Sequence, residues 1–132
     1  MKADSPERQR LLIQSMQSTL KKLENAYNNM IGKEANITLI KKRRDAVKIA
    51  LDSLENAWHG TGFPYEMLDI FEARTVIVGI LPSVKKQYQN AKEGSPQKTL
   101  LERRIASIEA AINALDTKSV KGDSNYVIKD EV

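Results

Sequence analysis

The most constraining feature of this 132-residue chain is the regular spacing of apolar side chains near its start, at alternating intervals of three and four residues. This spacing puts every apolar side chain on one face of an α-helix and is typical of helices that pack lengthwise against other helices. The series consists of Ile13, Met16, Leu20, Leu23, Tyr27 and Met30. The segment therefore predicts a long amphipathic helix that needs partner helices to cover its apolar face.

Proline and glycine mark the ends of this helix and of three more. Ser5-Pro6 and Ser95-Pro96 each combine a capping hydroxyl with proline at the first helical position, and both features favour a helix start. Asn36 and Pro64 are candidate starts for the two helices between them. Glycines at positions 32, 60, 62 and 94 stand where helices would end.

Each later segment has its own apolar line. The second contains Ile37, Ile40, Val47, Leu51, Leu54 and Trp58, the third Met67, Leu68, Phe71, Val78, Leu81 and Tyr88, and the fourth Leu101, Ile105, Ile108, Ile112 and Leu115. Four helices with short connections imply antiparallel neighbours. We therefore predict an all-α fold, an antiparallel four-helix bundle over residues 1–118 in up-down-up-down order.

Two segments need separate treatment. The run Val76-Ile77-Val78-Gly79-Ile80 is rich in β-branched residues, but a single strand would have no partner in this chain. We expect a helix with a kink near Gly79–Pro82, because Pro82 cannot donate a hydrogen bond to the preceding turn; a break into two shorter helices is the alternative. Residues 119–132 lack helical periodicity, so we expect them to form a disordered tail.

The composition excludes several kinds of chemistry. There is no cysteine and only one histidine, His59, which excludes disulfides, thiolate metal sites and the usual zinc and di-iron sites. Phosphate-binding loops, calcium loops and nucleophile elbows are absent from the sequence. Glu55 and His59 lie four residues apart, which favours an ordinary pairing at a helix end. We therefore predict no catalytic residues, no metal and no cofactor, and a protein that is not an enzyme.

The sequence also bears on localisation. The longest apolar run, Val76–Pro82, is far too short to span a membrane. The first residues lead into a polar segment without the apolar stretch of a signal peptide. We expect a protein that is cytoplasmic, or exported without a cleaved signal peptide.

The net charge of +4 raises the question of nucleic-acid binding. The only basic run is Lys41-Lys42-Arg43-Arg44, and four consecutive residues spread around the whole circumference of a helix. Acidic residues such as Asp45 and Asp52 share the polar face, which weakens the attraction to phosphates. Nucleic acid is therefore not the favoured partner, although a basic nucleic-acid-binding bundle remains an alternative.

Three arginines fall on the apolar faces of their predicted helices. Arg43, Arg74 and Arg104 each lie within the apolar sector when positions are advanced by 100° per residue. One interpretation is an inward polar cluster that binds an anion or an acidic side chain of a partner. The alternative is that each guanidinium reaches solvent or pairs with an acid at the edge of the stripe, such as Glu24 or Glu55.

The most specific local feature is the segment Leu54-Glu55-Asn56-Ala57-Trp58-His59-Gly60, which places the only tryptophan two residues before a glycine at a helix end. Trp58 can pack under the turn, while Gly60 can adopt a backbone conformation that other residues avoid. The segment Leu54–Phe71 resembles the WXG-motif family of small helical-hairpin proteins exported by type VII secretion systems. Members of that family place Trp-x-Gly in the turn between two antiparallel helices.

Many members also carry a Tyr-x-x-x-Asp/Glu secretion signal after the second helix. Tyr126-Val127-Ile128-Lys129-Asp130 matches this pattern, as does Tyr65–Asp69. The resemblance implies a non-enzymatic, exported or export-associated protein that works by helix pairing, with Trp58, Gly60, Tyr126 and Asp130 as turn or interaction residues. The alternative is purely structural: a tryptophan that caps the core beside a glycine that ends a helix.

The sequence as a whole favours a protein–protein interaction domain whose partner is another helical protein or a second copy of the chain. A type VII secretion-associated partner or substrate is the specific expectation from the resemblance. A small cytosolic immunity, inhibitor or regulatory protein is the alternative class.

Overall fold

The computed structural model describes residues 5–33 and 37–122, with only the backbone described for the last four. It contains four helices, α1 (Pro6–Met30), α2 (Thr38–His59), α3 (Met67–Asn90) and α4 (Pro96–Gly122), and these described ranges contain no strand. The predicted all-α four-helix fold is confirmed.

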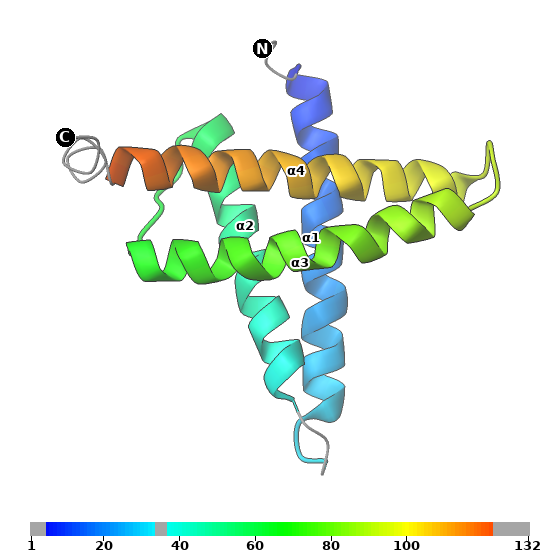
Figure 1. Ribbon diagram of the computed structural model, residues 1–132, viewed down its shortest axis with the longest axis horizontal. Helices are drawn as coiled ribbons and strands as arrows, with labels where there is room; N and C mark the ends of the chain where they lie inside the picture. Colours follow the sequence, from blue (N-terminus) through cyan, green and yellow to red (C-terminus); the bar gives the residue numbers. More distant parts are fainter. Residues whose placement is uncertain (1–4, 34–36, 123–132) are drawn as a thin grey trace.

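The helices form two antiparallel hairpins, α1–α2 and α3–α4, and the second hairpin lies across the first (Figure 1). Both α2 and α4 contact all three other helices, whereas α1 and α3 do not meet. Consecutive helices within each hairpin are antiparallel as expected. The two hairpins cross, however, and do not align lengthwise, so the end of the α1–α2 hairpin projects beyond α3 and α4 (Figure 1).

Helix starts and ends largely follow the sequence signals. The hydroxyls of Ser5 and Ser95 accept hydrogen bonds from the backbone N–H groups of Arg8 and Lys98, and Gly60 ends α2 in the left-handed conformation at φ 72°. The expected start of the third helix at Pro64 is wrong. Residues 60–66 connect α2 to α3, which begins at Met67 with reciprocal capping bonds between Glu66 and Asp69.

The third helix is continuous, with Pro82 inside it. The predicted break is therefore excluded, and the ribbon of α3 bends in its middle (Figure 1). The fourth helix continues to Gly122, four residues past the expected boundary at residue 118. The expected tail beyond that point, residues 123–132, lies outside the described residues.

The core combines one face of each helix. Its buried members include Leu12, Ile13 and Met16 of α1, Ala46, Val47, Ala50 and Leu54 of α2, Ile70, Ala73, Ile77 and Val84 of α3, and Leu101, Ile108, Ala111 and Leu115 of α4. The predicted apolar face of α3 is wrong in part, because Leu68 and Phe71 were expected inside and are each 66% exposed. Leu81 and Tyr88, from the same predicted line, do pack against the core. Since α3 carries apolar residues around most of its circumference, one face covers the core and another is left in solvent.

Candidate protein-interaction site

One exposed face of α3 carries three apolar side chains, Leu68, Phe71 and Val78, with Thr75 between them. We call this line of four residues the outer seam. Its spacing of three, four and three residues places all four side chains on one side of the helix. All four residues are exposed, and no described helix covers them. Single exposed apolar residues are common, but a regular line of them marks a surface suited to a partner.

Gly79 adjoins the outer seam and is also exposed. A Cβ atom added at this position would meet nothing within 4 Å. Glycine within a helix costs about 1 kcal/mol relative to alanine, and no described neighbour of Gly79 requires a glycine there. A helix of another molecule would be able to approach closely at this position, because glycine has no side chain to keep a second backbone away.

A groove of about 520 Å³ lies beside the outer seam, between α2 and α3. Apolar and charged side chains both line it. The apolar ones include Ala46, Ile49, Phe71, Ala73 and Val76, and the charged ones are Lys42, Asp45 and Lys48 from α2 and Asp69 and Glu72 from α3. Phe71 belongs to both the groove and the outer seam, so the two features form one continuous surface.

The connection between α2 and α3 fixes the start of that surface. The Tyr65 hydroxyl donates a hydrogen bond to Asp52 Oδ2 at 2.5 Å, and Lys48 Nζ lies 3.3 Å from the same oxygen. The rings of Phe63 and Tyr65 meet edge to face with centroids 4.9 Å apart, and Lys118 Nζ of α4 lies 4.8 Å from the centre of the Phe63 ring. These contacts tie the connection to both α2 and α4, and so position the first turn of α3.

Burial raises the pKa of Tyr65 from 10.0 to about 12, with the hydrogen bond to Asp52 and the negative charges of Asp52 and Asp69 adding to the effect. Because the folded state holds this proton more tightly than the unfolded state, the contribution to stability is complete below pH ~10 and is lost as the pH rises toward 12. Asp52 on α2 and Asp69 on α3 thus both favour the neutral phenol.

A difference titration of tyrosinate absorbance between the parent protein and Tyr65→Phe should therefore show a midpoint near pH 12. Asp52→Asn should lower this midpoint only in part, because burial remains. Circular dichroism at each pH would check that the chain is still folded. A midpoint near 10, the ordinary value for tyrosine, would contradict the buried, hydrogen-bonded placement of Tyr65.

The Trp-x-Gly motif lies at the end of α2 and in the connection that follows. Trp58 is half-buried and packs against the core, and the Gly60 N–H donates to the Asn56 carbonyl at 3.1 Å. His59 Nδ1 lies 3.5 Å from Glu55, the expected pairing at a helix end. The motif lies where the first hairpin joins the second. Since α2 and α3 cross (Figure 1), it is not in the turn of an antiparallel helical hairpin. Tyr126 and Asp130 lie outside the described residues.

The structure does not bring the three predicted inward arginines together. Arg43 is exposed. The guanidinium of Arg74 donates two hydrogen bonds to the carboxylate of Asp116 on α4, and its side chain is 42% exposed. Arg104 is partly buried, and its Nε has no hydrogen-bond partner. The inward cluster is therefore wrong. The alternative describes two of the three arginines, because Arg43 reaches solvent and Arg74 pairs with an acid, which is Asp116 and neither Glu24 nor Glu55. Long charged side chains carry their charge to the surface, since burial without a partner is costly.

Within residues 5–33 and 37–122, no group of three histidine, cysteine, aspartate or glutamate side chains is placed to hold a metal ion. In the same ranges, none of the helices has the length and apolar character needed to cross a bilayer. Comparison of the chain with protein-family models, curated proteins and solved structures finds no match. The fold and this surface therefore define the class of the protein: a four-helix protein with an apolar seam on α3 that none of the described helices covers.

Proposed function

We propose that this chain is a non-enzymatic protein–protein interaction domain that binds a helix of a partner protein along the outer seam of α3. The observation that carries the proposal is the exposure of Leu68 and Phe71, each 66% exposed on a helix whose opposite face is fully committed to the core. Leaving two large apolar side chains two-thirds exposed forgoes about 1–2 kcal/mol each. A partner that covers them recovers this free energy.

The geometry of the surface favours a helix as the bound element. Anchors spaced three and four residues apart are the pattern by which one helix packs lengthwise against another. The groove between α2 and α3 supplies a depression beside the seam, with Lys42, Asp45 and Lys48 on the α2 side and Asp69 and Glu72 on the α3 side. Because the α2 side is net positive and the α3 side is negative, the two sides would favour one orientation of an amphipathic helix.

A narrower proposal, that the partner belongs to a type VII secretion system, depends on the resemblance carried by Trp58 and Gly60. Its support is that the connection beginning at Gly60 leads directly into the outer seam at Leu68. A pairing helix on the seam would therefore lie next to the motif. A small immunity or inhibitor protein would use the same surface with a different partner.

The experiment is site-specific photo-crosslinking in the source cells. A photoreactive side chain in place of Phe71 should give one defined crosslinked product, and the same side chain in place of Gln87, which is exposed on α3 but off the seam, should not. The crosslinked protein would then be purified and its affinity measured. Phe71→Glu should weaken that affinity at least tenfold, equivalent to about 1.4 kcal/mol.

The matched control is Gln87→Glu, which adds the same charge to the same helix and should leave the affinity unchanged. Circular dichroism would confirm that both variants keep the parent helicity. Equal crosslinking at positions 71 and 87, or an affinity that Phe71→Glu does not alter, would contradict the proposal. A secretion component as the crosslinked protein would support the narrower version, and a toxin would support the immunity alternative.

A further inference from the structure

The positive charge of the chain is concentrated in one place. Residues 21–45 carry seven basic and three acidic side chains, which accounts for the whole net charge of +4, and the remaining residues carry fourteen of each sign. The segment comprises the end of α1 and the start of α2. This is the end of the α1–α2 hairpin that projects beyond the second hairpin (Figure 1).

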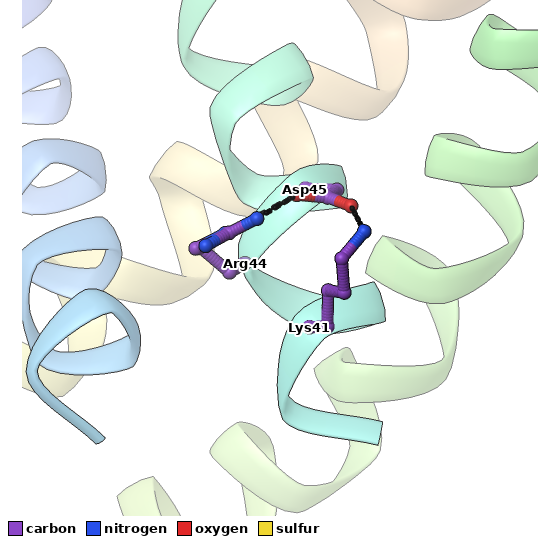
Figure 2. Close-up of polar contacts among 3 residues, drawn as sticks. All are labelled: Lys41, Arg44 and Asp45. Atoms are coloured by element: carbon purple, nitrogen blue, oxygen red, sulfur yellow. Dashed lines mark hydrogen bonds and ion pairs between the residues drawn. The ribbon is translucent and has the colours of Figure 1, made fainter. Parts of the chain in front are cut away.

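We define the hairpin end as Ile31, Lys33, Leu39 and Lys41–Arg43. Most of its basic side chains form no ion pair with a described acid. Asp45 is the nearest acid along α2 and is already engaged by Lys41 Nζ at 3.5 Å and by Arg44 at 2.9 Å (Figure 2). Arg44 is further held 4.4 Å from the centre of the Tyr27 ring on α1, so it belongs to the hairpin interface.

Three cations of the hairpin end remain without such a partner. Lys33, Lys42 and Arg43 are exposed and form no ion pair within the described part of the chain. Among the described residues, the nearest acids on the two helices are Glu24 and Asp45, and both act on Arg44; Glu34 lies outside the described residues. The exposed Lys33, Lys42 and Arg43 therefore present a positive potential to solvent. This potential favours binding of an anionic partner.

Aliphatic side chains accompany these cations. Ile31, which caps α1, is 52% exposed, and Leu39, in the first turn of α2, is 55% exposed. A phosphate backbone offers nothing to cover them, since contacts with phosphates are ionic and polar. An anionic bilayer offers both components: headgroup phosphates and carboxylates for the cations, and the boundary of the acyl region for the aliphatic tips.

We propose that the projecting end of the α1–α2 hairpin binds the surface of an anionic lipid bilayer, with Lys33, Lys42 and Arg43 on the headgroups and Ile31 and Leu39 inserted at their boundary. This site is separate from the outer seam of α3, and of its residues only Lys42 also lines the groove beside that seam. Binding here does not depend on the proposed protein partner.

The test is cosedimentation of the full-length chain with vesicles of phosphatidylcholine alone and of phosphatidylcholine with an equal part of phosphatidylserine. The chain should bind the anionic vesicles, should not bind the neutral ones, and should be released by salt. The double variant Lys33→Gln/Arg43→Gln should bind about 25-fold more weakly, because each basic residue near such a surface contributes about fivefold.

The matched control is Lys86→Gln/Lys92→Gln, which removes the same charge from exposed positions on the second hairpin and should retain parent binding. Leu39→Gln leaves the charge unchanged and should weaken binding at least threefold if aliphatic insertion contributes. Equal losses in the two double variants, or no effect of Leu39→Gln, would overturn the proposal. Binding of duplex DNA without binding of anionic vesicles would also overturn it, and would assign the hairpin end to nucleic acid.

Discussion

Leu54→Ala is expected to lower the free energy of unfolding by about 2–5 kcal/mol. Leu54 lies on α2 with no exposed surface, and α2 contacts all three other helices. The substitution removes transfer free energy and leaves a cavity, which the surrounding helices can fill only in part. Urea denaturation followed by circular dichroism would measure the loss as a lower midpoint.

The matched control is Leu39→Ala, the same chemical change on the same helix at a side chain that is 55% exposed. Exposed substitutions away from caps and networks change stability by about 0.5 kcal/mol or less, and alanine is a good helix former. If the two variants unfold at the same urea concentration, Leu54 is not in the core and the assignment of the inner face of α2 fails.

The local parts of this fold could be predicted from sequence because their causes are local. Ser5 and Ser95 cap their helices by accepting hydrogen bonds from the backbone N–H groups three residues later. Gly60 ends α2 at a position where glycine is preferred. These interactions lie within a few residues of one another. The chain therefore specifies the number of helices and most of their limits without reference to the tertiary structure.

The face that α3 turns inward could not be predicted in this way. Two apolar lines compete on this helix: the outer seam, and the buried line Ile70, Ala73, Ile77 and Val84. Choosing the larger side chains, Leu68 and Phe71, gave the wrong face, because the crossing hairpins favour a line that includes a small residue, Ala73. The presence of two lines was the available signal that one of them would face solvent.

The polar contacts that position the site were also beyond sequence reasoning. Tyr65 reaches Asp52 from 13 residues away, and Arg74 reaches Asp116 from 42 residues away. Each acid is one of many along the chain, and only the tertiary arrangement selects it. Ser107, whose hydroxyl donates to the Leu12 carbonyl across 95 residues, shows the same limit within the core.

Alanines in the core are the physical basis of the crossing arrangement. Ala46, Ala50, Ala73 and Ala111 belong to one buried cluster, and together they represent α2, α3 and α4. Small side chains let helix axes approach closely where helices cross. Ser53, fully buried beside Ala50, adds another small side chain, and its hydroxyl is satisfied by the Ala50 carbonyl at 2.6 Å.

Ala50→Leu should therefore destabilise the fold by about 1–3 kcal/mol or more, because the added methylenes find no space at a position with no exposed surface. Ala57→Leu, the same enlargement at an exposed position of α2, should be nearly neutral, since leucine and alanine are both good helix formers. Urea denaturation of the two variants isolates the packing effect from helix propensity. Equal stability of the two would mean that Ala50 is not closely packed in the core. A loss confined to Ala50→Leu would indicate close packing around Ala50 in the core that α2 shares with the other three helices.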